Sequence, residues 1–358
     1  MAKFITEDDL EQAILEKLQQ QPFNYDIIIC DSDPAKRDDL NDGTGRLSKK
    51  ECVLPSVMLE SLQRLNPNIS YDKLIDLVQE YKKDYTGTDI VTTNYNLYQM
   101  IRNNKKIDVI KNGKKDFGFV KFIDFDNVEN NTFTAVSQMW IQGRYNYRRP
   151  DIILFVNGFP LVFIELKNSV VKVQEAYDKN LQDYKRDIPN LFAFNQICVL
   201  SNGNETRVGA FNAYYEYFFE WLKVNDEKEK IDREAIKTNG LSIQLLIDGL
   251  FNKENLIDYI ENFILFENQK IKIIAKNHQY IGVNNLMKSV DNRKELNGKL
   301  GVFWHTQGSG KSYSMIMFAR KVKRKVTGNF TFLIITDRDD LDGQICKTCF
   351  AFKKTADI

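Results

Sequence analysis

Two carboxyl-bearing residues and a lysine stand at the ends of neighbouring apolar runs, where they could do metal-dependent chemistry. Asp151 precedes the run 152–156, and Glu165-Leu-Lys167 ends the run that follows Asn157-Gly-Phe-Pro160, a sequence typical of a hairpin turn. A two-residue Asn-Gly turn pairs Asp151 with Ile164 and puts Glu165 on the opposite face. An odd-length loop or a bulge pairs Asp151 with Glu165 and places Lys167 on their face.

Like-charged carboxylates that face each other destabilise a sheet unless a cation holds them. Mg²⁺ or Mn²⁺ fits this need, with Asp151, Glu165, the Leu166 carbonyl and water as ligands. Lys167 could then position or deprotonate a water that attacks a phosphodiester. These residues form the constellation of PD-(D/E)xK nucleases; the alternative is a pair of structural acids that flank surface strands.

A second group of residues could bind a nucleotide. The segment His305-Thr-Gln-Gly-Ser-Gly-Lys-Ser312 directly follows the apolar run 300–304, and a strand, a glycine-rich loop and a helix make a phosphate-binding loop. The residues expected to contact the nucleotide are Gly308, Ser309, Gly310, Lys311 and Ser312. The glycines let backbone N–H groups surround phosphates, Lys311 faces the β- and γ-phosphates, and Ser312 faces Mg²⁺. His305 replaces the usual first glycine, as often happens in helicase-type loops, and the alternative is a chance turn.

The charge balance excludes a strong general field for polyanions, because 50 Lys+Arg nearly cancel 49 Asp+Glu. Nucleic-acid binding must therefore use local patches. Arg144, Arg148 and Arg149 lie beside the acid pair in sequence. The run 320–325 is equally consistent with DNA contact and with a solvated helix face.

Other classes of protein are disfavoured by composition. Two histidines and scattered cysteines argue against a zinc centre, although Cys346-x-x-Cys349 could form half of one. The odd count of five cysteines suits a reducing cytoplasm. No apolar stretch approaches the roughly 18–20 residues of a membrane span, and the N-terminus lacks the pattern of a signal peptide.

Periodicity predicts the elements that would position these groups. The first helix begins after Thr6, a candidate N-cap with Asp9 three residues on. The other expected elements are helices within 53–83, 172–186, 256–266 and 270–289, and strands at 117–125, 132–140, 151–156, 161–166, 197–200, 301–304 and 330–336. The charged stretch 224–240 predicts a surface connection, with a domain boundary between 224 and 256.

Longer segments resemble the N-terminal part of type I restriction endonuclease R subunits, which carry a motor and a nuclease. The resemblance covers most of the chain and is carried by segments 148–168, 191–203, 273–280, 304–312 and 336–344. The last two resemble helicase motifs I and Ia. The resemblance implies an α/β fold, with a PD-(D/E)xK domain (a mixed sheet flanked by helices) over 1–240. The start of a RecA-like parallel-sheet helicase domain would follow over 241–358, truncated after motif Ia.

The resemblance also implies roles for further residues. The family places Gln-x-x-x-Tyr on the helix after the lysine; Tyr184 fits the tyrosine, and Asn180 or Gln182 stands for the glutamine. Glu11 fits an additional acid near the metal, or a solvated helix face. Gln279 resembles the glutamine that reads adenine in such motors, or is a surface glutamine. Asp337 and Asp339 fall within motif Ia.

The implied function is Mg²⁺-dependent cleavage of unmodified foreign double-stranded DNA, coupled to ATP-driven translocation. The implied partners are methyltransferase and specificity subunits, in the cytoplasm and without a membrane. A fragment lacking the later motor motifs is not expected to translocate alone. Two other hypotheses remain: a catalytically silent assembly module that docks on those subunits, and a nucleotide-binding protein whose acid pair is structural. The recognised DNA sequence and the cleavage position do not follow from the residues.

Overall fold

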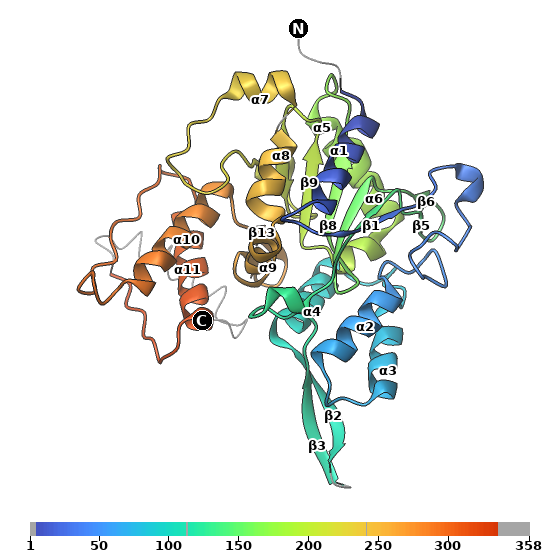
Figure 1. Cartoon of the computed structure of the whole chain (residues 1–358), viewed down its shortest axis with the longest axis horizontal. Coiled ribbons are helices and arrows are strands. Elements are labelled where there is room, and N and C mark those ends of the chain that lie inside the picture. The colour runs from blue at the N-terminus through green and yellow to red at the C-terminus, as the bar shows by residue number, and fades with distance from the viewer. Residues whose placement is uncertain (1–4, 112–113, 241, 336–358) are drawn as a thin grey trace.

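The computed structural model describes the chain apart from residues 1–4, 112–113, 241 and 336–358 (Figure 1). A seven-stranded sheet forms its centre, with two parallel and four antiparallel neighbouring pairs. In spatial order its strands are β1 (Asp26–Ile29), β4 (Phe133–Ser137), β7 (Ile152–Val156), β8 (Phe159–Leu166), β9 (Ile197–Ser201), β10 (Thr206–Gly209) and β11 (Phe219–Glu220). The fold is therefore mixed α/β, as the sequence predicts.

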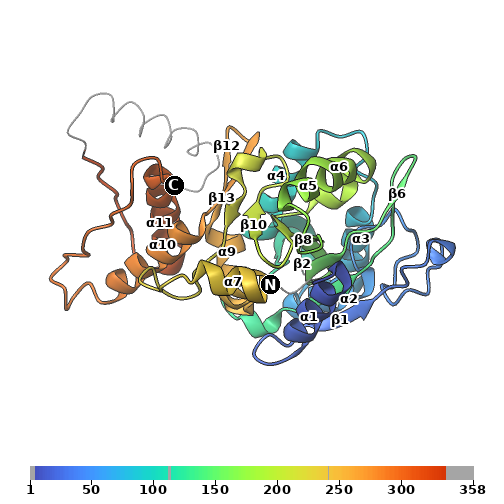
Figure 2. The same cartoon turned by 90° about the horizontal axis from the view of Figure 1, so that it is seen from above.

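Within the described residues, three two-stranded hairpins and a set of helices surround this sheet (Figure 2). The hairpins are β2 (Lys105–Lys111) with β3 (Lys114–Val120), β5 (Ile141–Gln142) with β6 (Tyr147–Arg148), and β12 (Ile264–Glu267) with β13 (Ile271–Ile274). The α-helices are α1 (Glu7–Gln19), α2 (Pro55–Leu65), α3 (Tyr71–Tyr81), α4 (Ile90–Asn103), α5 (Val173–Glu175), α6 (Gln182–Asp187), α7 (Arg233–Asn239), α8 (Ser242–Leu246), α9 (Lys253–Asn262), α10 (Asn277–Asp291) and α11 (Lys311–Lys325). Among the described residues, no helix has both the length and the apolar character needed to cross a membrane.

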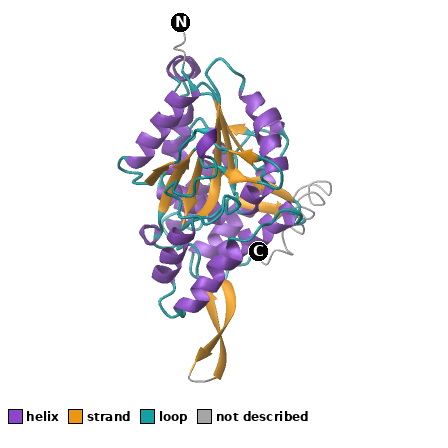
Figure 3. Cartoon of the chain, turned by 90° about the vertical axis from the view of Figure 1, so that its right-hand side faces the viewer, coloured by secondary structure: helices purple, strands orange, loops and turns teal. Residues whose placement is uncertain are grey.

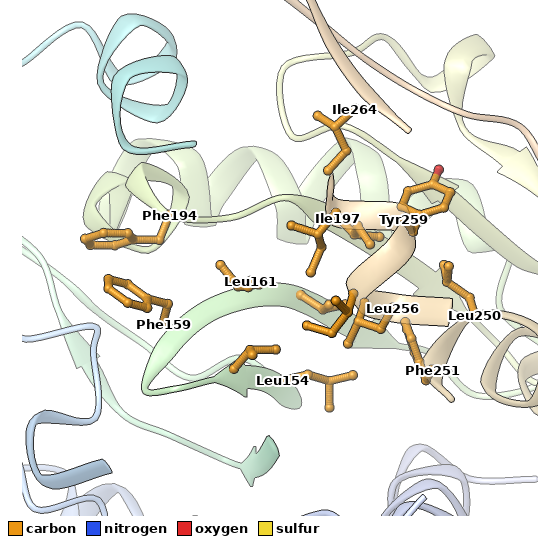
Figure 4. Close-up of a cluster of buried hydrophobic side chains, with 14 of the residues drawn as sticks. Leu154, Phe159, Leu161, Phe194, Ile197, Leu250, Phe251, Leu256, Tyr259 and Ile264 are labelled. Carbon is orange, nitrogen blue, oxygen red and sulfur yellow. The ribbon is translucent and has the colours of Figure 1, made fainter. Parts of the chain in front are cut away.

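The two faces of the sheet pack into different cores because side chains alternate along each strand. Leu154 and Ile164 belong to one core, which also holds residues of α1, α4, α8 and α9 (Figure 4). Ile153 and Phe163 belong to the other core, beneath the helical segment 173–187. That segment joins α5 to α6 through a π-helix over Ala176–Leu181. Such π-helical turns are frequent at functional sites.

Several predicted elements form as expected. Thr6 caps α1 in a capping box with Asp9, which satisfies backbone N–H groups that the first helical turn leaves free. Helices α2 and α3 fill the predicted stretch 53–83, and the segment 172–186 is helical. The hairpin of β7 and β8 is present, and β9 lies parallel to β8.

Other predictions about the second half of the chain are wrong. The predicted helices 256–266 and 270–289 are interrupted by the β12–β13 hairpin, whose turn residues Asn268 and Gln269 have positive φ. The segment 301–304 and the described part of the predicted strand 330–336, residues 330–335, form no strands. A strand needs a hydrogen-bonded neighbour, and the described residues offer these segments none. Up to residue 335, the last described one, the expected RecA-like parallel sheet is therefore not formed.

The strand predicted over 117–125 also differs from the structure. It ends at Val120 and pairs with the preceding segment in the β2–β3 hairpin, outside the central sheet. The charged stretch 224–240 contains the short helix α7. Beyond it, side chains of α8 and α9, among them Leu246 and Leu256, join the same core as the first face of the sheet.

Candidate active site

The β7–β8 hairpin brings Asp151 and Glu165 opposite each other. Its turn has two residues, Asn157 and Gly158, and both have positive φ, as a type I′ turn requires. This turn alone would pair Asp151 with Ile164. A bulge restores the other register, because Phe155 pairs with Pro160 whereas Leu154 pairs with Val162, and Ile152 then pairs with Ile164. The ladder ends at this pair, and the next residues beyond it on the two segments are Asp151 and Glu165, the juxtaposition that the sequence analysis required.

Strand alternation places Asp151, Glu165 and Lys167 on one face. Two residues away along the strands, Ile153 and Phe163 both belong to the core beneath the segment 173–187, so the three polar residues share that side. Glu165 is buried, with 2% of its surface exposed, while Asp151 and Lys167 are half-buried. The site therefore lies at the end of the sheet, partly open to solvent.

Lys167 holds the site together in this conformation. Its Nζ donates to Glu165 Oε1 at 3.2 Å and to the Leu166 carbonyl at 2.6 Å. Asp151 Oδ2 accepts from the Leu166 N–H at 2.7 Å. The residues after Lys167 are tied to the first helix, since Asn168 Oδ1 accepts from the Glu7 N–H at 3.0 Å. Sequence reasoning did not identify this link.

Burial dominates the electrostatics of the acid pair. Loss of solvent raises the pKa of Asp151 to about 6, with Glu11 and Glu7 acting in the same direction. Burial, and then the neighbouring Asp151, raise the pKa of Glu165 well above its ordinary value. For Lys167, burial acts to lower the pKa, but Glu165, Glu7 and Asp151 together raise it. The lysine is therefore a cation, and each carboxyl group is costly to ionise.

The oxygens of this site fit a hard divalent cation. Glu165 Oε2 is buried and has no hydrogen-bond partner among the described residues, although buried polar atoms nearly always have one. Carboxylate and carbonyl oxygens are the ligands that Mg²⁺ prefers. In the described part of the chain, no three His, Cys, Asp or Glu side chains cluster as metal ligands. A cation here would rest on Asp151, Glu165, the Leu166 carbonyl and water.

Tyr184 lies above the acid pair on α6. Its hydroxyl donates to the Arg149 carbonyl at 3.1 Å, and burial, then Glu165 and Asp151, raise its pKa well above the ordinary value. Of the two candidate amides, Asn180 is the one whose side-chain hydrogen bond acts to lower the pKa of the Tyr184 hydroxyl. Gln182 instead donates to the Tyr177 carbonyl at 3.2 Å.

Glu11 projects from α1 to the end of β4, next to the acid pair. It accepts a hydrogen bond from Ser137 Oγ at 2.6 Å and another from Gln138 Nε2. The Gln138 N–H bonds the Asp151 carbonyl at 2.9 Å. Burial raises the pKa of Glu11, and the negative charge of Glu11 raises the pKa of Asp151. Glu11 is thus partly buried, and its carboxylate oxygens bond Ser137 and Gln138. No pattern in the sequence indicated these two partners.

The glycine-rich loop leads directly into α11, which begins at Lys311. Gly308 and Gly310 have positive φ, and a side chain at 310 would approach Gln279 Nε2 to 2.7 Å. Lys311 Nζ donates to the carbonyls of His305 and Thr306, at 2.9 and 3.1 Å. The lysine therefore curls over the same loop that would surround a phosphate.

Gln279 is not a surface residue, because 2% of its surface is exposed. It begins α10 by bonding the Lys276 N–H at 2.9 Å, and its Nε2 donates to the Gly310 carbonyl at 2.9 Å. Ser309 and Ser312 lie at the same loop and helix start. Motif Ia, with Asp337 and Asp339, and the pair Cys346 and Cys349 lie outside the described residues.

The predicted basic patches prove to be largely structural. Arg148 pairs with Asp187 at 2.6 Å and with Asp183 at 3.2 Å. Within the run 320–325, Arg320 and Lys321 are buried, whereas Lys323, Arg324 and Lys325 are exposed on the helix. Arg320 is buried and donates to Tyr98 Oη and to main-chain carbonyls; Lys321 pairs with Asp258, and Arg324 and Lys325 pair with Glu261. Arg144 and Arg149 instead stack on Tyr145 and Trp140.

Comparison with known proteins gives two family matches. Residues 4–217 match the family described as type I restriction enzyme R protein N terminus, and residues 278–357 match the SWI2/SNF2 ATPase family. The first match covers more than half of the chain and contains the acid pair, Lys167, Tyr184 and Glu11. The second contains Gln279 and the glycine-rich loop.

Individual relatives agree with the first match. The type I restriction enzyme HindI endonuclease subunit of Haemophilus influenzae is 36% identical over 96% of this chain and 32% of its own length. A Methanocaldococcus jannaschii protein assigned as the MjaIXP endonuclease subunit of a type I restriction enzyme is 32% identical over 84% of this chain and 30% of its own length. The chain thus spans about a third of the length of these relatives.

Proposed function

Because the chain belongs to the family of type I restriction enzyme R protein N termini, we propose that it is the nuclease-bearing part of a DNA-cleaving restriction subunit. Its reaction is Mg²⁺-dependent hydrolysis of a phosphodiester in double-stranded DNA, and its domain 1–240 is of the PD-(D/E)xK type. The observation that supports this proposal is the bulge in β8, after which Ile152 pairs with Ile164, so that Asp151 and Glu165 are the next residues beyond this pair.

Each residue has a role that follows from its contacts. Asp151 and Glu165 would hold the cation, whose chemistry would be to activate a water and to stabilise charge on the phosphate. The Leu166 N–H fixes the orientation of Asp151. Lys167 donates to Glu165 and to the Leu166 carbonyl, two groups that would also hold the cation, so its ammonium would lie beside the reacting water. Its raised pKa suits a proton-bearing, orienting group that faces the phosphate.

The surrounding residues complete the site. Tyr184, with Asn180 at its hydroxyl, covers Glu165 and excludes water from that carboxylate. Glu11, on α1, carries a negative charge that raises the pKa of Asp151, and this charge would strengthen the attraction for a divalent cation. We assign it a role in metal binding for this reason.

The second half of the chain supports ATP binding in a motor. The match to SWI2/SNF2 ATPases and the loop from Gly308 to Ser312 at the start of α11 agree on this. Lys311 would exchange the carbonyls of its own loop for phosphate oxygens. We assign base recognition to Gln279, whose Nε2 donates to the Gly310 carbonyl. In the whole protein, translocation would be coupled to cleavage, with methyltransferase and specificity subunits as partners, in the cytoplasm.

A cleavage assay tests the nuclease assignment. The chain is incubated with supercoiled plasmid and Mg²⁺ or Mn²⁺, alone and with the partner subunits and ATP. Asp151→Asn and Glu165→Gln should abolish cleavage and remove the binding of Mn²⁺ measured by electron paramagnetic resonance. Glu175→Gln, an isosteric change at an exposed position on α5, should leave both intact. Cleavage that survives both site variants would make the acid pair structural and favour the assembly module.

A further inference from the structure

The β2–β3 hairpin projects from the body of the protein beyond α2 and α3 (Figure 1, Figure 3). Its seven-residue strands are paired throughout, from Lys105 with Val120 to Lys111 with Lys114. Strands of this length extend about 23 Å. An isolated two-stranded ribbon is marginally stable in water, so its anchorage and its exposed face both need an explanation.

One face of the ribbon is anchored to the body at its base. Lys105 Nζ bonds Glu80 at 2.6 Å and Tyr81 Oη at 3.0 Å. Gly118 lies so close to Ile69 that an added side chain there would approach its Cδ1 to 3.2 Å. Just after the ribbon, the Asn66 side chain bonds both the N–H and the carbonyl of Lys121. The ribbon is thus held in a fixed direction.

The opposite face carries two exposed phenylalanines. Phe117 is 55% exposed and Phe119 is 65% exposed. In the register, Lys106 pairs with Phe119 and Asp108 with Phe117, so these four side chains share one face. The Lys106 ammonium lies 3.6 Å from the Phe117 ring centre. Folding gains little from exposed rings, and two of them beside a lysine on a projecting ribbon indicate a binding surface.

The charge of the ribbon identifies the kind of partner. Residues 105–120 contain five lysines and two aspartates, whereas the whole chain has a net charge of +1. In the run 320–325, Arg320, Lys321, Arg324 and Lys325 form ion pairs or bonds to backbone carbonyls, and Lys323 is exposed. A lysine-rich element with exposed rings has the chemistry of a nucleic-acid contact, in which cations bind phosphates and rings pack on bases or sugars.

We propose that the β2–β3 ribbon is a second DNA-binding element, in which Lys106, Lys114 and Lys115 contact phosphates while Phe117 and Phe119 contact bases or sugars. This inference deepens the proposed function, on which it rests for DNA as the polyanion. The ribbon lies beyond the Asn157–Gly158 end of β8, because Gly158 contacts α2 and α2 is followed by Asn66 at the ribbon base. The acid pair lies at the other end of β8, about 25 Å from the Asn157–Gly158 turn. The ribbon therefore anchors DNA at a distance from the cut.

The lysine contribution is tested by DNA binding without cleavage. Binding of the chain to a fluorescent 30-base-pair duplex and to a 30-nucleotide single strand is followed by anisotropy in EDTA over a range of salt concentrations. Lys114→Ala/Lys115→Ala should weaken binding at least about tenfold at low salt and reduce the salt slope for duplex by about 2. Lys228→Ala/Lys230→Ala removes the same charge from exposed positions elsewhere and should change neither.

The ring contribution is tested on the same two probes. Phe117→Leu/Phe119→Leu keeps apolar side chains in the strand and removes the rings, so it should weaken binding about tenfold with an unchanged salt slope. A greater loss on the single strand identifies stacking on unpaired bases, and an equal or greater loss on duplex identifies contact within a groove. Both results support the proposal.

The outcomes separate this inference from the nuclease assignment. Asp151→Asn should bind both probes like the wild-type chain, so loss of cleavage with normal binding concerns the acid pair alone. The ribbon proposal is overturned if the wild-type chain does not bind DNA, or if the ribbon variants bind as the wild type does. Ribbon variants that bind DNA normally but fail to assemble with partner subunits would show a protein-docking surface instead.

Discussion

Replacing Asp151 with asparagine should make the protein more stable at pH 8, although it removes a group that we assign to catalysis. Burial raises the pKa of Asp151 from 3.8 to about 6, so the folded protein holds an ionised carboxylate at a cost above that pH. A difference of this size corresponds to about 3 kcal/mol. Asparagine removes the charge and retains an oxygen that can accept the Leu166 N–H, which now bonds Asp151 at 2.7 Å.

The effect has a definite pH dependence. Because the pKa of this acid is higher in the folded than in the unfolded state, the folded state binds the proton more tightly, and stability falls as pH rises from about 4 to about 6. Below this pH range the Asp151 carboxyl is protonated in both the folded and the unfolded state, so it does not reduce the stability of the wild type. The advantage of Asp151→Asn should therefore approach 3 kcal/mol at pH 8 and fade towards zero near pH 4.

Urea unfolding in EDTA at several pH values measures this effect. The urea midpoint of Asp151→Asn should exceed that of the wild type at pH 8, and the two should converge in acid. Glu175→Gln, at an exposed position on α5, should stay within about 0.5 kcal/mol of the wild type. A lower midpoint for Asp151→Asn at pH 8, or a gain that is equal at every pH, would refute the argument. Mg²⁺ should stabilise the wild type and not the variant.

Two further predictions concern the turn and the nucleotide loop. Gly158→Ala should lower stability by more than about 2 kcal/mol, because a Cβ there would lie 2.6 Å from the Leu54 carbonyl. Gly87→Ala has a similar positive φ without a neighbour within 4 Å, so its thermal melting should show a smaller loss, and equal losses would exclude the clash. Lys311→Ala should eliminate ATP binding by calorimetry and, in the assembled restriction complex, both translocation and cleavage. Lys323→Ala is the matched control, and ATP-independent cutting by the Lys311 variant at the wild-type rate would show that the two activities are not coupled.

Elements with local signals could be predicted from the sequence. The first helix has its cap in Thr6 and Asp9, three residues apart, and the structure contains that capping box. The start of α11 is set by Gly310, whose positive φ ends the loop before Lys311. In each case the decisive contact joins residues within one turn of chain, which is why the residue pattern reveals it.

The β12–β13 hairpin shows why other elements could not be predicted. Lys272 stands in an apolar stretch that looks helical, yet its side chain is buried at 2% exposure. Its ammonium donates to Asn94 Oδ1, the Asn195 carbonyl and Gln196 Oε1, at 3.0, 2.6 and 2.7 Å. A buried lysine needs such partners, and these come from segments more than 75 residues away. The sequence around residue 272 therefore does not indicate that this lysine has buried hydrogen-bond partners.

The candidate site also depends on a residue whose conformation is set by a segment that is distant in sequence. The Asn157–Gly158 turn has a clear local signal and by itself gives the register that separates the two acids. Leu161 is the extra residue that reverses this outcome, and its carbonyl accepts from the Gln196 N–H at 2.7 Å at the start of β9. The bulge therefore exists because β9 pairs with β8, a contact across 35 residues of chain. From the residues around the turn one can state that a bulge is needed for catalysis, but its position is decided by the neighbouring strand. The opposition of Asp151 and Glu165 is thus a product of the tertiary fold.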